Sequence, residues 1–202
     1  MAEQPGYADP SYFEQLYARD PDPWRFATSE YERDKYAATL AALPPRPFAS
    51  GFEIGCSIGV LTRQLSERCD ALLAVDVSDI ALEQARQRCP GVSFANMDLR
   101  SEWPDGAFDL VLFSEVLYYL GLDGIRLVAK RTMDALAPGG VVGLVNWFGP
   151  TDGACTGDEA AELFIAEAGS RLAPWMQTRA EKYRLDIFTD GPADRSTARP
   201  TP

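Results

Sequence analysis

Five short apolar runs alternate with helical patterns between residues 50 and 145. The runs cover residues 52–54, 71–75, 92–94, 108–113 and 140–145. Runs of this length suit strands that are buried on both faces, whereas the apolar residues between them recur at helical spacing, as at Leu61, Leu65 and Cys69. This alternation predicts an α/β fold, with a mostly parallel sheet and helices on both of its faces.

The N-terminal region departs from this alternation. Residues 7–36 are rich in aromatic side chains and are interrupted by the sequence D-P-D-P at 20–23, which predicts a turn between two short helices. The second helix is expected over residues 29–43, because Pro44 and Pro45 cannot continue it. We therefore expect a helical cap over residues 1–45 that belongs to the main domain.

The C-terminal region also departs from the alternation. A predicted helix over residues 158–172 is followed by two strand-like segments, 175–180 and 183–188, which predict a closing antiparallel hairpin. The tail, residues 189–202, is rich in proline and polar residues, so we expect it to be disordered. The main domain is thus expected to cover residues 46–188.

Composition limits the possible partners. The chain has 202 residues, enough for one core, and a net charge of −11, which would repel nucleic acid and anionic membranes. No apolar run is long enough to span a bilayer and the first ten residues do not resemble a signal peptide, so a cytoplasmic protein is expected. The four cysteines form no C-x-x-C pair and histidine is absent, so no metal site is expected.

A glycine loop follows the first predicted strand. The sequence E-I-G-C-S-I-G places Gly55 and Gly59 where the strand turns into a helix, and glycine there lets the backbone approach a ligand closely. A tight turn without a ligand would use the same residues. A dinucleotide fingerprint would read G-x-G-x-x-G, and the serine at position 57 argues against NAD.

Two acidic residues follow the next two strands. Asp76 lies 23 residues after Glu53, where a carboxylate can accept hydrogen bonds from both ribose hydroxyls of an adenosine, although a helix cap would also explain it. Asp98, after the third strand, can accept from an adenine amino group while apolar neighbours cover the ring. An acid in a surface turn is the alternative there.

Polar residues also follow the fourth strand. The sequence S-E-V-L-Y-Y-L places Glu115, Tyr118 and Tyr119 at the mouth of the expected site, where they are candidate catalytic residues. The tyrosines are equally suited to the edge of the core. The later sequence L-A-P-G-G at 136–140 is expected to turn a helix into the fifth strand, which is an architectural role.

Together these motifs resemble the class I methyltransferases that use S-adenosylmethionine (SAM), which have a Rossmann-like fold. The resemblance covers residues 50–145, and the reversed final hairpin also matches. The sequences E-I-G-C-x-x-G and E-V-L-Y-Y-L, with D-P-W at 22–24 and Y-E-R at 31–33, are similar to the nodulation protein S (NodS) family of N-methyltransferases. Members of that family methylate the free amine of a deacetylated chitooligosaccharide.

The resemblance implies a role for individual residues. The cofactor SAM would be held by Trp24, Arg33, Glu53, Gly55, Cys56, Ser57, Gly59, Asp76, Val77, Asp98, Leu99 and Ser114. Within that set, Arg33 would pair with the methionyl carboxylate. The acceptor pocket would be bordered by Asn146, Trp147 and Phe148, together with the loop at 149–157.

The expected activity is methylation of a small molecule, most readily the amine of an amino sugar, by a monomer or homodimer. Transfer of a methyl group from a sulfonium requires that the acceptor lone pair is aligned with the methyl group and that water is excluded. Glu115 or a tyrosine at the mouth of the site would orient the amine and accept its proton. O-methylation of a carboxylate or phenol is the alternative. A second alternative is a protein that binds SAM but catalyses no reaction.

Overall fold

Seven strands form one sheet in the computed structural model, which describes residues 8–191. The strands are β1 (Phe48–Ile54), β2 (Cys69–Asp76), β3 (Ser93–Asn96), β4 (Phe108–Ser114), β5 (Leu136–Trp147), β6 (Leu172–Arg179) and β7 (Tyr183–Asp190). Their order is β3-β2-β1-β4-β5-β7-β6, and only β7 runs antiparallel to its neighbours β5 and β6. The predicted parallel sheet with a closing antiparallel hairpin is confirmed.

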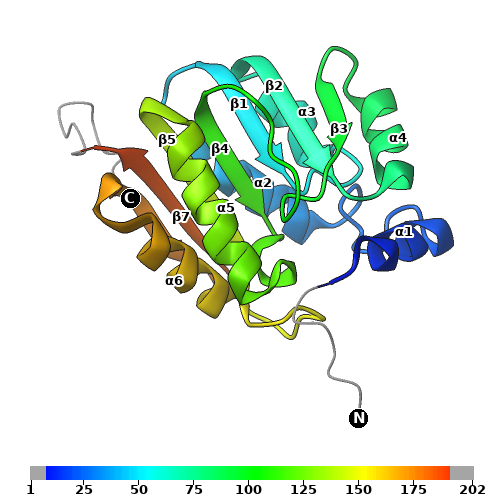
Figure 1. The fold of residues 1–202 in the computed structure, drawn as a ribbon. Helices are drawn as coiled ribbons and strands as arrows, with labels where there is room; N and C mark the ends of the chain where they lie inside the picture. The colour runs from blue at the N-terminus through cyan, green and yellow to red at the C-terminus, as the bar shows by residue number, and fades with distance from the viewer. Residues whose placement is uncertain (1–7, 192–202) are drawn as a thin grey trace.

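Helices cover both faces of this sheet (Figure 1). They are α1 (Pro10–Arg19), α2 (Glu30–Ala42), α3 (Val60–Ser66), α4 (Asp79–Arg88), α5 (Gly121–Ala135) and α6 (Gly157–Ala168), with the short 3-10 helices η1 (Leu117–Tyr119) and η2 (Gly169–Arg171). Ile125 of α5 and Phe164 of α6 pack in the core of one face. Tyr36 of α2 and Leu65 of α3 pack in the core of the other. No helix within residues 8–191 is long and apolar enough to cross a membrane.

Three predicted boundaries need correction. Cys69 is the first residue of β2 and not part of a helical stripe. Strand β5 begins at Leu136 instead of residue 140, because Leu136 already pairs with Phe108 of β4. The next pair is Leu110 with Val141, so a register shift accommodates the extra residues of β5, which include the proline and glycines. Helix α6 ends at Ala168, since Gly169 adopts a positive φ of 65° that an α-helix cannot continue.

The cap consists of α1 and α2. Ser29 caps α2 by accepting a hydrogen bond from the backbone of Glu32, and the helix ends before Leu43, close to the predicted limits. In α1, Tyr17 packs against Ile58 and Ala81, so this helix lies over the glycine loop and α4. The division at residues 45 and 46 stays a prediction. Of the tail predicted to be disordered, Thr189 and Asp190 belong to β7 and Gly191 donates a backbone hydrogen bond to Arg171. Residues 192–202 lie outside the described residues.

Candidate active site

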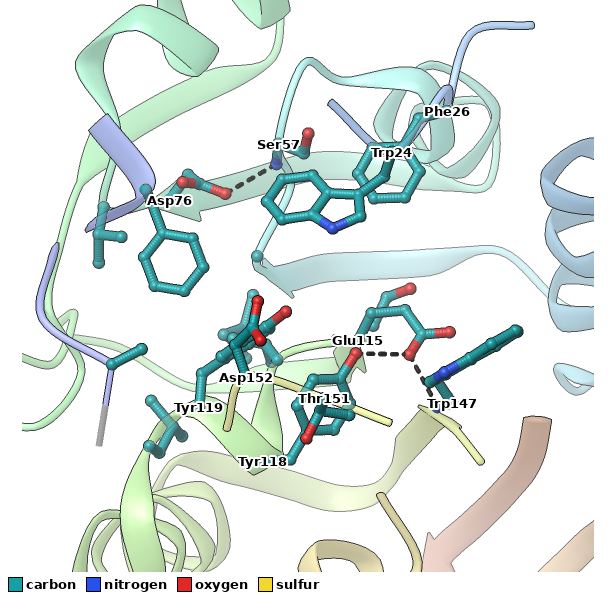
Figure 2. Close-up of a pocket in the computed structure, with 18 of the residues that line it drawn as sticks. Trp24, Phe26, Ser57, Asp76, Glu115, Tyr118, Tyr119, Trp147, Thr151 and Asp152 are labelled. Atoms are coloured by element: carbon teal, nitrogen blue, oxygen red, sulfur yellow. Dashed lines mark hydrogen bonds between the residues drawn. The ribbon is translucent and has the colours of Figure 1, made fainter. Parts of the chain in front are cut away.

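A cavity of about 490 Å³ lies at the carboxyl ends of β1, β2 and β4. Ligands bind at this edge of parallel sheets because the loops there are free to diverge. Figure 2 shows Asp76 and Ser57 at one part of the cavity and Glu115 and Trp147 at another. Twelve of the residues expected to hold cofactor or acceptor line it: Trp24, Gly55, Ser57, Asp76, Val77, Asp98, Leu99, Ser114, Glu115, Tyr118, Tyr119 and Trp147.

The backbone of the glycine loop adopts conformations that residues other than glycine rarely adopt. Gly55, Ser57 and Gly59 all have positive φ values, of 75°, 51° and 79°. A Cβ on Gly55 would lie 3.1 Å from the Cβ of Val116, so glycine lets the loop pass this close to Val116, which also lines the cavity. Gly59 instead begins α3 and packs on Ala85, outside the cavity.

Asp76 joins β2 to the glycine loop. Its Oδ2 accepts a hydrogen bond from the backbone of Ser57 (2.9 Å), and its Oδ1 accepts from the backbone of Ser78 (3.1 Å). Burial raises the pKa of this carboxyl, while the backbone donors oppose that shift. Because a carboxylate has about four lone-pair sites, Asp76 retains acceptor capacity toward a ligand hydroxyl.

Asp98 and Leu99 lie on the β3 side of the cavity with Val77. Arg100 holds the Asp98 carboxylate through two hydrogen bonds of 2.9 and 2.6 Å, and these contacts lower the pKa of Asp98. The carboxylate is therefore charged and fixed in direction. Met97 lines the same region, which supplies the apolar cover expected around a ring.

The Glu115 carboxylate accepts hydrogen bonds from three different elements. Its Oε1 accepts from Lys35 Nζ at 2.6 Å, and its Oε2 accepts from Tyr118 Oη at 2.9 Å and from the backbone of Trp147 at 2.8 Å. Its backbone has a φ of 59°, an unfavourable value for glutamate that is maintained by the surrounding contacts. Glu115 thus ties together α2, β5 and η1, whose Tyr119 also lines the cavity.

The three residues predicted to border the acceptor, at the end of β5 and just after it, do not all lie at the cavity. Trp147 lines the cavity, whereas Asn146 has no exposed surface and does not, because successive side chains of β5 point to opposite faces. Phe148 lies under the guanidinium of Arg179, 5.2 Å from its ring centre, and is also outside the cavity. The following loop does contribute, through Thr151 and Asp152.

Three further residues expected at the cofactor, Arg33, Glu53 and Cys56, do not line this cavity. Arg33 is on the outer side of α2 with a side chain 64% exposed, near Glu30 and Asp34. The basic residue that enters the cavity from this helix is Lys35. Cys56 and Glu53 border a separate space of about 20 Å³ beside the glycine loop.

Sequence reasoning missed most of what the cap contributes. Lys35, Phe13, Tyr17, Phe26, Ser29, Tyr31 and Glu32 line the cavity. Tyr17 hydrogen-bonds to Ser57, and Trp24 stacks on Phe26 at 5.6 Å (Figure 2). The concentration of aromatic residues in 7–36 was the available signal, because aromatic rings that a small helical cap cannot bury are available to line a pocket.

Glu53→Gln is expected to flatten the pH dependence of the unfolding free energy between about pH 5 and pH 8. Burial raises the pKa of Glu53 from its ordinary 4.5 to about 8, so between these values the folded state holds a proton that the unfolded state has lost. The stabilisation from this proton is complete below about pH 4.5 and decreases as the pH rises toward 8. Urea unfolding at four pH values measures it, and parallel curves for the two proteins would contradict it.

A family model described as nodulation protein S (NodS) matches residues 12–141, more than half of the chain. The chain belongs to the nodulation protein S family. Nodulation protein S from Rhizobium tropici is 34% identical over 124 residues, which are 59% of this chain and 52% of that protein. Trans-aconitate 2-methyltransferase from Acidovorax ebreus (strain TPSY) is also 34% identical, over 61% of this chain and 48% of that protein. The chain spans about half the length of these curated relatives.

The NodS likeness extends to three dimensions. The crystal structure of N-methyltransferase NodS from Bradyrhizobium japonicum WM9, in complex with S-adenosyl-L-homocysteine (SAH), superposes with a TM-score of 0.75. The match covers 91% of this chain and 99% of that chain at 24% identity. The Rossmann-like class I methyltransferase fold predicted from the sequence is therefore confirmed.

Proposed function

We propose that this NodS-family protein binds SAM and transfers its methyl group to the amine of a small molecule, such as an amino sugar or a related metabolite. One observation carries the proposal: a single cavity contains Asp76 beside the glycine loop and Glu115 after β4. These are the two positions where this fold offers an acceptor for ribose hydroxyls and a polar group for the reaction. A monomer or homodimer in the cytoplasm remains our expectation.

The residues present fit SAM. Gly55 presents backbone without a side chain to the cavity, and Asp76 has acceptor capacity for ribose hydroxyls. Val77, Leu99 and Met97 offer apolar cover for adenine, with Asp98 beside them. When bound, SAM supplies an electrophilic methyl group. Within residues 8–191, no group of three or more histidine, cysteine, aspartate or glutamate side chains is arranged to hold a metal ion.

The acceptor end favours an amine. Aromatic rings of Trp24, Tyr118, Tyr119 and Trp147 line the cavity and would exclude water from the reacting atoms. Glu115 lies among them as a carboxylate with three donors. A carboxylate in an aromatic site attracts and orients a cationic or hydrogen-bonding nitrogen.

A second candidate is O-methylation of a carboxylate. Lys35 favours it, because its ammonium group is buried in the cavity and would pair with an anionic acceptor. The relatives named trans-aconitate 2-methyltransferase are consistent with such an acceptor. In that case Lys35 would have to leave one of its two glutamates.

The test is transfer of a labelled methyl group from SAM to matched acceptors. Glucosamine and chitosan oligomers are expected to be labelled, whereas N-acetylglucosamine and chitin oligomers, which lack the free amine, are not. Labelling of tricarboxylates but of no amine would replace the proposal with O-methylation. Binding of SAH without transfer to any of these acceptors would favour a protein that binds SAM without catalysis.

A further inference from the structure

We infer that Glu32 of α2 binds the ammonium form of the acceptor and removes one of its protons before methyl transfer. The inference rests on the function proposed above. It concerns a residue to which the sequence motifs assigned no role, and it replaces Glu115 as the proton acceptor. Glu115 remains as a positioning residue.

Glu32 and Lys35 lie one helical turn apart on the side of α2 that faces the cavity. Only 7% of Glu32 and 2% of Lys35 is exposed, and both line the cavity. Lys35 Nζ is 3.1 Å from Oε1 and 3.0 Å from Oε2 of Glu32, and 2.6 Å from Oε1 of Glu115. One ammonium group therefore serves two carboxylates.

This cluster has a net charge of −1 when all three groups are ionised. Among residues 8–191, the basic residues that line the cavity are Lys35 and Arg100, and Arg100 holds Asp98. A buried charge without a counter-charge is costly, so the cluster favours a ligand that brings one positive charge. The ammonium form of an amine does so.

Of the two carboxylates, Glu32 is better suited to accept a proton. Glu115 already accepts three hydrogen bonds, which a protonated carboxyl would weaken. Burial raises the pKa of Glu32. The titratable groups that face Glu32 are Lys35 and Tyr36 on its own helix, and Glu115 and Tyr118 on the opposite side.

Tyr31 provides a further contact beside Glu32. Its hydroxyl is buried and has no hydrogen-bond partner among residues 8–191. The ring lies 5.3 Å from Lys35 Nζ and contacts Trp147 edge to face. Because Tyr31 also lines the cavity, an acceptor that reaches this hydroxyl would satisfy it, as buried polar groups require.

The reaction balances with Glu32 as the base. The acceptor's N–H bond breaks, its electron pair stays on nitrogen, and the proton forms an O–H bond on Glu32. The nitrogen lone pair then forms the N–CH₃ bond while the S–CH₃ bond breaks, leaving its electrons on sulfur. Glu32 returns the proton to water after release, so one proton is produced for each methyl group transferred.

The experiment uses two ligands that share the adenosine and amino-acid parts of SAM. SAH is uncharged at sulfur, whereas sinefungin carries an amine at the corresponding position. Calorimetric titration of the full chain is expected to show that the wild type prefers sinefungin by roughly tenfold or more, as expected for a close charge pair. Glu32→Gln is expected to lose this preference while its SAH affinity stays within about twofold, since that contact is uncharged.

Glu30→Gln is the matched control. Glu30 lies in the same helical turn and the substitution removes the same charge, but its side chain is 86% exposed, so the preference should remain. An unchanged preference in Glu32→Gln would overturn the inference. A wild type that binds neither ligand would instead overturn the proposed function.

A second measurement applies if Glu32→Gln does not fold. In the wild type, the ratio of the two affinities is expected to fall as the pH is lowered from 8 to 4.5, because burial raises the pKa of Glu32 above its ordinary value of 4.5 and protonation removes the charge that pairs with the sinefungin amine. Asp76 and Asp98 face parts that the two ligands share, so their titration cancels in the ratio. A ratio that stays constant over this range would contradict the role of Glu32.

Discussion

Asp76→Ala is expected to weaken SAH binding by at least about 100-fold, equivalent to losing two hydrogen bonds to a charged group. The carboxylate has two roles in the structure. It holds the glycine loop through the backbone of Ser57 and the start of α4 through the backbone of Ser78. Its remaining acceptor capacity is directed to the cavity, where ribose hydroxyls would bind. The substitution removes both the ligand contact and the support of the loop.

Isothermal titration with SAH measures this loss, with thermal unfolding as a check that the variant is folded. Asp70→Asn is the control, because Asp70 is an exposed residue near the opposite end of β2 and should leave binding unchanged. Asp76→Asn separates the two roles, since the amide oxygen still accepts a hydrogen bond but carries no charge. A folded Asp76→Ala protein that binds SAH within tenfold of the wild type would exclude ribose binding at this position.

The parts of the fold and site that sequence predicted are those with local signals. Each buried strand is a run of apolar residues, and each motif at a strand end lies next to such a run, as Gly55, Asp76 and Glu115 do. Because the carboxyl ends of parallel strands meet at one edge, order along the chain was enough to bring these residues into one cavity.

Which side chains of α2 enter the cavity could not be predicted from a local sequence pattern. The sequence E-R-D-K offers two basic residues, and the choice between Arg33 and Lys35 depends on how the helix is rotated about its axis. Tyr36 and Thr39 are buried, which turns Lys35 inward and leaves Arg33 in solvent. That rotation is set by tertiary packing, with Tyr36 in the core and Tyr31 against Trp147 of β5 and Tyr183 of β7, and no local pattern reports it.

The end of β5 shows a second limit. Sequence reasoning grouped Asn146, Trp147 and Phe148 because they follow one another. In a strand that continues to Trp147, neighbours point to opposite faces, so consecutive residues cannot all line one cavity. Trp147 lines it, and its backbone N–H also holds Glu115.

Arg184→Met is expected to lower the free energy of unfolding by roughly 3–5 kcal/mol, the usual cost of breaking a buried ion pair. Arg184 lies opposite Asn146 on β7 and is only 4% exposed. Its guanidinium holds buried Asp186 through two hydrogen bonds of 2.7 and 3.1 Å, and reaches α6 through Asp158 and Glu162. Methionine fills similar volume but leaves the Asp186 charge with only a neutral donor from Gln177.

Urea unfolding and the melting temperature measure this loss, and a decrease of roughly 6–20 °C is expected for a chain of this size. Arg179→Met is the matched control: Arg179 also pairs with Asp158 at 2.9 Å, but its side chain is 58% exposed, so less than about 1 kcal/mol should be lost. Equal effects of the two substitutions would show that burial does not set the strength of this network. Because Arg184 joins β7 to α6 beside the end of β5, a weakened network should also loosen the strand end from which Trp147 holds Glu115.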